Sequence, residues 1–572
     1  MTYQAPLTDM LFTLRHAFGA DRLAGLPADA AELAEPVLAE AAKLAENTLA
    51  PLNVTGDRQG CTLANGAVET PKGWKDAYAA YRDGGWNGVP FATDHGGQGL
   101  PWTLAFPIQE MWQAANMAFG LCPLLNQGAV EAIAHHGSAE QKAYYLPKLV
   151  SGEWTGTMNL TEPQAGSDLA AVRTRAVRAD DGTYRVIGQK IFITYGEHDL
   201  AENIIHLVLA RLPDAPDGVK GISLFIVPKI LADGTRNDLV CAALEHKLGI
   251  HASPTCTMAF GDGGGATAYL VGRENEGIKY MFTMMNNARL SVGLQGVAIA
   301  EAATQKALSY ARDRVQGGGR AIVEHPDVKR MLLTMQAFVQ AGRMMAYDAA
   351  CALDSDNASR VDLLTPIVKG WCTDRAVDVA NLGVQVHGGM GFIEETGAAQ
   401  FLRDARILPI YEGTNGIQAL DLVGRKLIRD DGAAMRAWLD ENTPLLTELE
   451  ESHGADLSII GERLHAGFDA LRGATGALLA RGGENNGMDA AGAVAHPYLT
   501  LAGHVMAGAA LARGALAARA LFRAQDTGGF SSDYLQSRIT LARFFADHIL
   551  PQVEGLACTV RHGADAILAA RL

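Results

Sequence analysis

Apolar residues recur every three or four positions in two long stretches of the chain. From Leu33 to about Val150, segments such as LAEPVLAEAAKLAENTLAPLN show this spacing, and it returns from Gly277 to about Arg429. A period near 3.6 residues is typical of amphipathic helices that bury one face. The sequence therefore predicts two helical blocks.

Between these blocks the pattern changes to short β-branched or aromatic runs. The runs YRVIGQKIFIT, IIHLVLARL, GISLFIVPKI and CTMAF lie between Thr155 and Leu270, separated by DDG, DAPDG and DGT. Runs bounded in this way indicate strands joined by turns. Because the strands are grouped and do not alternate with helices, a doubly wound sheet is disfavoured. We expect a β-rich unit inserted into an α-helical protein.

The last part of the chain is predicted to be an additional helical unit. The segment RDDGAAMRAWLDENTP, residues 429–444, has the composition of a linker, and an Ala-rich helical pattern runs from Leu445 to Leu572. We therefore expect an N-terminal extension (1–34), an α-helical domain (35–155), a β-domain (156–272), a helical bundle (273–430) and a C-terminal helical domain (431–572).

Length and charge limit the classes of protein. A chain of 572 residues exceeds what one hydrophobic core usually supports. The 48 Lys+Arg against 63 Asp+Glu leave a net charge of −15, which opposes binding to nucleic acid or to an anionic membrane.

The seven cysteines are scattered without a C-x-x-C pair, so we expect reduced thiols and a cytoplasmic location. No export signal or membrane span is predicted, because the longest uncharged run, from Ala490, is broken by Pro497.

Two Gly-rich segments resemble phosphate-binding loops but lack their spacing. HGGQG (95–99) and HGGMG (387–391) contain neither G-x-G-x-x-G nor G-K-[ST], which disfavours a Rossmann or P-loop site. Both are also compatible with ordinary tight turns. The stretch MNLTEPQAGSD, from Met158 to Asp168, offers backbone and hydroxyl donors for the polar edge of a flat heterocycle, or forms a simple turn. No metal site is predicted.

The stretch LPIYEGTNGIQ places the carboxylate of Glu412 between apolar residues and a glycine. Partial desolvation there would raise its pKa and make it a better base near neutral pH. The same stretch is compatible with a helix start, in which an acid in the first turn is favourable for the helix dipole. Residue chemistry alone leaves both interpretations open.

Seven motifs together give a stronger signal. They are TEPQAGSD from Thr161, GQKIFIT ending at Thr194, KLGIHASPT (247–255), NNARL from Asn286, ARDR from Ala311, QVHGGMGF from Gln385 and IYEGTNGIQ from Ile410. In this order they resemble the acyl-CoA dehydrogenase family over about residues 35–430. The chain is similar to a longer subgroup, and EHKLGIHASPT and KIFITYGEHD are most similar to 3-methylmercaptopropionyl-CoA dehydrogenases. The resemblance implies a mainly α fold with a central β-barrel domain and an additional C-terminal helical domain.

The resemblance also implies an activity. Glu412 would take the proton α to an acyl-CoA thioester as hydride leaves the β carbon for noncovalent FAD, and the new α,β double bond would be trans. The substrate would be 3-methylmercaptopropionyl-CoA or a short- or medium-chain acyl-CoA, with a medium- or long-chain fatty acyl-CoA as the alternative. Electrons would pass to an electron-transferring flavoprotein.

Further site residues are carried over from the family by position. The flavin contacts from one subunit of a homodimer would be Met158, Leu160, Thr161, Gly166, Ser167, Phe192, Thr194, Thr414 and Gly416. The half of the FAD bound by the partner subunit would be reached by Arg314, Gln316, Gln385, Gly388 and Gly389. The acyl-CoA would contact Ser167, Asn286, Arg289 and Gly413.

Two other functions compete with this one. In an acyl-CoA oxidase, oxygen would reoxidise the flavin. In a flavoprotein that binds nucleic acid, the C-terminal domain would neutralise phosphates. Residues 431–572 hold 11 Arg and no Lys against 16 Asp+Glu, which disfavours phosphate binding.

Overall fold

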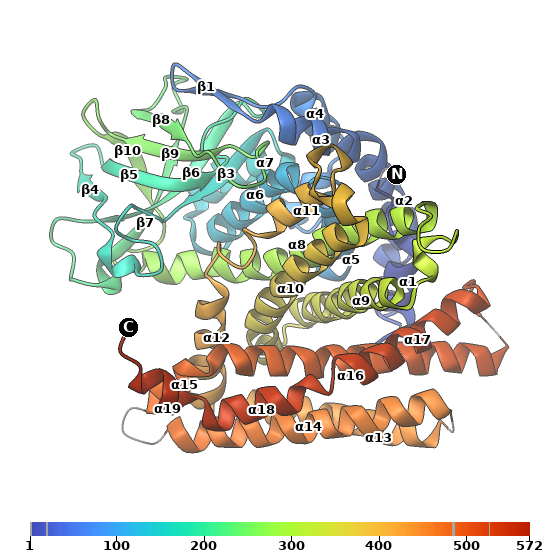
Figure 1. Ribbon diagram of the computed structural model, residues 1–572. Helices are drawn as coiled ribbons and strands as arrows, with labels where there is room; N and C mark the ends of the chain where they lie inside the picture. The colour runs from blue at the N-terminus through green and yellow to red at the C-terminus, as the bar shows by residue number, and fades with distance from the viewer. Residues whose placement is uncertain (1–2, 19–20, 453, 483–486, 526) are drawn as a thin grey trace.

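Helices make up most of the protein, and the strands gather at one end. The computed structural model describes residues 3–18, 21–452, 454–482, 487–525 and 527–572, and the side chains at positions 284, 286 and 287 lie outside the described part. In Figure 1 the strands lie together at the upper left, long helices cross the middle, and the C-terminal helices form a layer along the lower side. The predicted mainly α fold with a central β-domain and a C-terminal helical domain is confirmed.

The N-terminal part contains one short hairpin among its helices. The helices are α1 (Leu7–His16), α2 (Ala28–Leu44), α3 (Ala50–Gln59), α4 (Trp74–Asp83), α5 (Trp102–Ala115), α6 (Met117–His136) and α7 (Ala139–Ser151). Strands β1 (Thr62–Ala64) and β2 (Ala67–Glu69) are joined by Asn65 and Gly66, whose φ angles are 53° and 74°. Asn-Gly is a strong signal for such a hairpin turn. The prediction of a helical first block did not include this hairpin.

Strands β3 to β10 form a sheet that closes on itself. They are β3 (Trp154–Asn159), β4 (Arg175–Arg178), β5 (Tyr184–Thr194), β6 (Asn203–Arg211), β7 (Ile222–Pro228), β8 (Leu239–Leu244), β9 (Thr255–Phe260) and β10 (Ala266–Leu270). In the order β10-β7-β6-β4-β5-β9-β8, β10 also pairs with β5, and β3 pairs in parallel with β6. Val186, Val208, Phe225 and Met258 are fully buried in this unit. The pairing of β10 with β5 closes the predicted barrel.

The remaining helices form the bundle and the C-terminal layer. The bundle contains α8 (Gly277–Asp313), α9 (Pro326–Asp354), α10 (Ala358–His387), α11 (Ala398–Ala405) and α12 (Asn415–Val423). The C-terminal helices are α13 (Ala433–Glu451), α14 (Ala455–Gly482), α15 (Gly487–Ala493), α16 (Ala495–Ala524), α17 (Ser532–His548), α18 (Gln552–His562) and α19 (Ala564–Ala569).

The predicted linker at residues 429–444 is wrong, because most of it is helical. Helix α13 starts at Ala433 and continues through Pro444. Met435, Trp438, Leu439 and Leu445 are buried at helical spacing. Burial of this apolar face stabilises a helix whose charged composition resembles a linker.

Two of the described helices, α6 and α16, are long and apolar enough to cross a membrane. Inside the protein, however, the most apolar windows of α6 and α16 are 89% and 56% buried. Helix α16 packs against α9, α10, α12 and α17. Burial of this kind is typical of core helices, so the two segments are only weak evidence for spans.

A buried ion network joins the N-terminal helical domain to the bundle. The Arg343 side chain on α9 is fully buried and donates hydrogen bonds to Glu110 of α5 at 2.6 and 2.9 Å and to Glu301 of α8 at 2.7 Å. Tyr347 donates to Glu110 at 2.7 Å. Burial disfavours the charge of Arg343, but the two carboxylates outweigh this and hold the pKa of its guanidinium well above the ordinary value.

Asp9 extends this network to both ends of the chain. Its carboxylate lies 3.7 Å from the Arg343 guanidinium. It also accepts hydrogen bonds from Tyr534 at 2.7 Å and Arg538 at 2.9 Å, both on α17. The N-terminal extension is therefore tied to the bundle and to the C-terminal domain by charged groups.

Candidate active site

Glu412 lies in a loop between two helices and ahead of the second one. Helix α12 begins at Asn415, and the Thr414 side chain caps it by accepting a hydrogen bond from the backbone N–H of Ile417 at 3.2 Å. Glu412 has a φ angle of 54° and Gly413 one of 85°. The interpretation of Glu412 as an acid in the first helical turn is therefore wrong. A left-handed conformation costs a non-glycine residue roughly 1–2 kcal/mol, so the surrounding contacts must hold it.

The amine of Lys369 holds this loop from the side. Lys369, on α10, is fully buried. Its Nζ donates to the carbonyl oxygens of Leu408 at 2.9 Å and Gly413 at 2.8 Å, and to Oδ1 of Asn415 at 2.9 Å. The two carbonyls flank the segment that carries Glu412. Sequence reasoning missed Lys369, because one lysine in a helical pattern gives no signal.

The half-buried surroundings of Glu412 make its carboxyl a weaker acid than that of an ordinary glutamic acid. Desolvation raises the pKa of its carboxyl, and the positive charges of Arg289 and Lys369 oppose this effect. Arg289 on α8 is 5% exposed, lies 3.8 Å from Asp421, and has a buried Nε without a hydrogen-bond partner among the described residues. An orphaned guanidinium N–H beside a desolvated carboxylate suits the polar part of a bound ligand.

A buried polar chain ends at the residue before Glu412. Tyr411 donates its hydroxyl to Oε1 of Gln295 on α8. Gln295 then donates to Gln113 on α5 at 3.0 Å, and Gln113 donates to the carbonyl of Gly120 on α6 at 2.9 Å. Three helices therefore fix the orientation of Tyr411. Sequence reasoning did not single out these residues, because their contacts join distant segments.

One end of the barrel brings several predicted flavin residues together. The backbone N–H of Ile191 donates to the carbonyl of Thr161 at 2.9 Å, and Thr157 donates its hydroxyl to the carbonyl of Thr194 at 2.7 Å. Phe192 lies between these contacts with a φ angle of 60° and is 57% exposed. An exposed aromatic ring at this end of the barrel fits the edge of a flavin.

The turn TEPQAGSD is anchored by a buried ion pair. Glu162 accepts hydrogen bonds from Lys190 at 2.8 Å and from the Thr174 hydroxyl at 2.6 Å, and Lys190 also donates to the carbonyl of Leu160 at 2.9 Å. Burial disfavours the Glu162 carboxylate, but Lys190 outweighs this and lowers its pKa to about 2. Around this anchor Met158 is buried, Leu160, Thr161 and Thr194 are half-buried, and Gly166 and Ser167 are exposed.

The residues predicted to reach the partner's FAD form a second group. The rings of Tyr310 and His387 stack with centroids 4.3 Å apart, which places the ends of α8 and α10 side by side. A Cβ added to Gly388 or Gly389 would meet no atom within 4 Å, so the backbone there is open to a ligand. The predicted residues at these helix ends are all exposed: Arg314, Gln316, Gln385, Gly388 and Gly389.

The other predicted ligand contacts differ in their surroundings. Gly413 borders Arg289, since an added Cβ would lie 3.7 Å from Nη2 of Arg289. Thr414 uses its hydroxyl for the helix cap, and Gly416 is exposed. The side chain of Asn286 lies outside the described residues.

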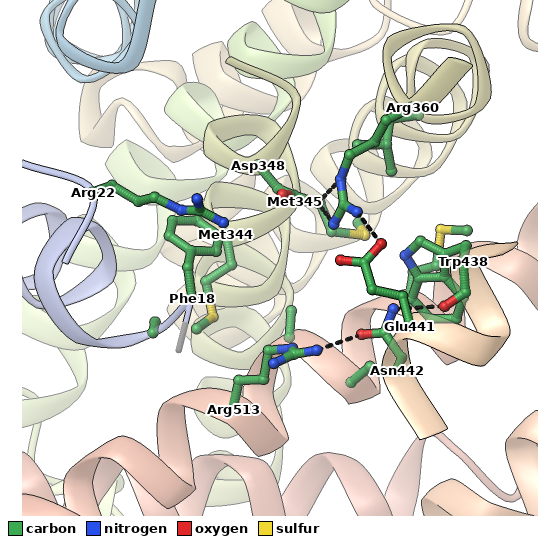
Figure 2. Close-up of a pocket in the computed structure, with 15 residues that line it drawn as sticks. Phe18, Arg22, Met344, Met345, Asp348, Arg360, Trp438, Glu441, Asn442 and Arg513 are labelled. Carbon is green, nitrogen blue, oxygen red and sulfur yellow. Dashed lines mark hydrogen bonds and ion pairs between the residues drawn. The ribbon is translucent and has the colours of Figure 1, made fainter. Parts of the chain in front are cut away.

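One cavity among the described residues lies apart from these groups. It has a volume of about 90 Å³ and lies between the N-terminal extension, the bundle and the C-terminal domain. Figure 2 shows Arg360 bridging Asp348 and Glu441 at one side, at 2.8 and 2.6 Å. None of the residues that line it belongs to the predicted flavin or thioester contacts. It is therefore not the candidate active site.

Family models match nearly the whole chain. The N-terminal, middle and C-terminal domains of acyl-CoA dehydrogenase match residues 33–153, 157–262 and 275–428. The model described as "Acetyl-CoA dehydrogenase C-terminal like" matches residues 433–571. The candidate site residues, from Met158 to Gly416, all lie within the matched middle and C-terminal domains.

Individual proteins and structures show the same similarity. The chain is 47% identical to the 3-methylmercaptopropionyl-CoA dehydrogenase of Ruegeria pomeroyi over 100% of both chains. The butyryl-CoA dehydrogenase structure from Megasphaera elsdenii is 29% identical, with a TM-score of 0.61 over 69% of this chain and 97% of that one. An acyl-CoA dehydrogenase from Bacillus anthracis complexed with FAD is 21% identical, with a TM-score of 0.75 over 95% and 89%. The chain belongs to the acyl-CoA dehydrogenase family.

Proposed function

We propose that this protein is an FAD-dependent acyl-CoA dehydrogenase in which Glu412 is the catalytic base. The observation that carries this proposal is a desolvated carboxylate, with a raised pKa, on a strained loop beside Arg289. A carboxylate with a raised pKa is a stronger base, which suits removal of the weakly acidic proton α to a thioester. The exposed Phe192 ring and the groups around Thr161 fit a flavin.

In the proposed mechanism the chain positions a proton acceptor and shields it partly from water. The Glu412 carboxylate accepts the α proton of the acyl group. FAD, when bound, supplies the acceptor for the hydride that leaves the β carbon. The positive charges of Arg289 and Lys369 lie near Glu412 and oppose the rise in its pKa that desolvation causes. The product is the trans α,β-unsaturated thioester.

The proposed substrate is 3-methylmercaptopropionyl-CoA or another short acyl-CoA. This proposal is supported by the relative of that name, which is 47% identical over the full length of both chains. Anaerobic dye-coupled rates over a panel of acyl-CoAs test it. The panel contains 3-methylmercaptopropionyl-CoA and straight chains of increasing length. Higher kcat/KM for long straight chains than for the short thioether would contradict this substrate.

We also propose an electron-transferring flavoprotein as the electron acceptor and a homodimer as the assembly. Exposed apolar side chains near the predicted partner-facing residues support the dimer, since Phe392 is 87% exposed and Met390 48%. Light scattering of the purified protein tests the assembly. Peroxide release without an added acceptor would favour the oxidase alternative.

Cytoplasmic location, the absence of nucleic-acid binding and the domain boundaries stay predictions.

Replacement of Glu412 tests the catalytic assignment directly. Glu412→Gln retains the shape but removes the proton acceptor, so we expect FAD and thioester to bind while the rate falls about 10²–10⁴-fold. The wild-type rate should rise with pH through the raised pKa of Glu412, because only the deprotonated form accepts a proton. Glu395→Gln, at an exposed carboxylate, is the matched control. Near-normal dye reduction by Glu412→Gln would defeat the assignment.

A further inference from the structure

Lys369 joins both ends of the loop that carries Glu412. Its acceptors at Leu408 and Gly413 enclose the residues from Pro409 to Glu412, and the third acceptor, Asn415, is the first residue of α12. All three distances lie between 2.8 and 2.9 Å. One side chain therefore fixes the beginning of the loop, its end and the start of the next helix.

The number of acceptors matches only the charged form of the amine. A protonated lysine has three N–H donors, while the neutral amine has two and a lone pair. With three oxygens around Nζ, the neutral form loses one of its three hydrogen bonds and directs a lone pair at that oxygen. Gly413 and Asn415 would then keep only longer hydrogen bonds, from Gln418 at 3.4 Å and from Thr373 at 3.3 Å. A lone pair that faces a carbonyl or amide oxygen is repulsive, so the loop geometry depends on the proton of Lys369.

Burial of Lys369 brings the titration of its amine within reach of ordinary pH. Burial lowers the pKa of the amine to about 7, against the opposing effects of Glu412 and Asp374, while Arg289 adds to the lowering. Asp374 is itself held by Nδ2 of Asn415 at 2.7 Å and by Nε2 of His496, on α16, at 3.1 Å.

We propose that Lys369 is a positioning residue for catalysis, which holds the Glu412 loop in its working geometry only while its amine carries a proton. The inference rests on the proposed function, in which Glu412 takes the α proton. Glu412 acts deprotonated and Lys369 acts protonated, so the two groups impose opposite limits on the pH dependence. A fall in rate on the alkaline side is the signature of Lys369.

Lys369→Met tests this proposal in the FAD-loaded, full-length protein. Methionine keeps an unbranched side chain but has no donor. Flavin reduction by saturating acyl-CoA is followed anaerobically from pH 6 to 10, and the acyl-CoA concentration dependence gives the apparent affinity. Lys306→Met is the matched control, because Lys306 on α8 is also partly buried with a lowered pKa but donates no hydrogen bond to the loop.

We expect Lys369→Met to reduce flavin at least 10-fold more slowly at pH 7, with the apparent affinity changed less than 2-fold and the alkaline fall absent. Lys306→Met should keep the wild-type profile. A wild-type profile without an alkaline fall, or one that Lys369→Met reproduces, would overturn the proposal. If no acyl-CoA reduces the wild-type flavin, the proposed function fails instead, so the two failures are distinguishable.

A second variant covers the case in which Lys369→Met does not fold or bind FAD. Lys369→Ala lacks the three methylenes and the nitrogen of the side chain, a gap that n-propylamine can fill. We expect propylamine, but not propan-1-ol, to restore part of the flavin reduction rate. Equal effects of the amine and the alcohol would show that the residue only fills space, and would overturn the proposal.

Discussion

Arg343 offers the sharpest test of how the domains are held together. Its guanidinium is fully buried and makes close contacts with two carboxylates, Glu110, which is also fully buried, and Glu301. Arg343→Met removes the cation, so Glu110 keeps only the hydrogen bond from Tyr347 and Glu301 only that from Gln305. Loss of one member of a buried ion pair typically costs about 3–5 kcal/mol, because the remaining charge stays in a poor solvent.

The expected change in melting temperature follows from the size of the chain. At about 2.1 cal/mol/K per residue, 572 residues have an unfolding entropy of about 1.2 kcal/mol/K. A loss of about 3–5 kcal/mol therefore lowers Tm by about 2.5–4 °C if the chain unfolds as one unit. Differential scanning calorimetry of wild type and variant at equal FAD saturation measures this shift.

Two further variants distinguish loss of the buried ion pair from the loss of any arginine side chain. Arg463→Met removes a surface arginine that lies 3.4 Å from Glu462 and has a side chain 45% exposed, so Tm should change by less than about 1 °C. The double variant Glu110→Gln, Arg343→Met should recover part of the loss, because no unpaired charge remains at position 110. If Arg343→Met melts within 1 °C of wild type, the ion network does not stabilise the junction of the domains.

Two more predictions concern the catalytic loop and the C-terminal domain. Gly413→Ala should lower the rate about 10-fold with FAD retained, measured by dye reduction, because φ is 85° and the new Cβ would lie 2.8 Å from Nε2 of Gln418. An unchanged rate would show that the loop adapts freely. A chain ending at Gly432 should aggregate in light scattering, because removal of α16 uncovers the buried ring of Trp371, which donates to His504 at 3.2 Å. A soluble, dimeric truncation would contradict this.

The sequence predicted the order of helical and β-rich regions because periodicity is a local property. Strands β5, β6, β7 and β9 match the β-branched runs, and the long bundle helices match the 3.6-residue spacing. The prediction of a linker around Trp438 is wrong, because the charged residues of α13 lower its average hydrophobicity although one face of the helix is apolar and buried. Amino-acid composition alone does not show which face of a helix packs against another part of the protein.

The candidate site was predictable only in part. Glu412 stood out because of its apolar neighbours, but its left-handed backbone and the helix start at Asn415 depend on contacts with α10. Lys369 lies 43 positions before Glu412, and Arg343 lies 233 positions from Glu110. Such contacts form only when the chain folds, so no local pattern indicates them.

The packing of α16 against α12 has a consequence for how this protein can change over time. Helix α12 begins directly after the Glu412 loop, and its buried Leu422 and Val423 belong to the same apolar cluster as the C-terminal helices. A substitution in α16 that shifts α12 can therefore change the position of the catalytic loop. Recombination that exchanges the C-terminal domain between relatives should succeed only when the matching surface of α12 is inherited with it.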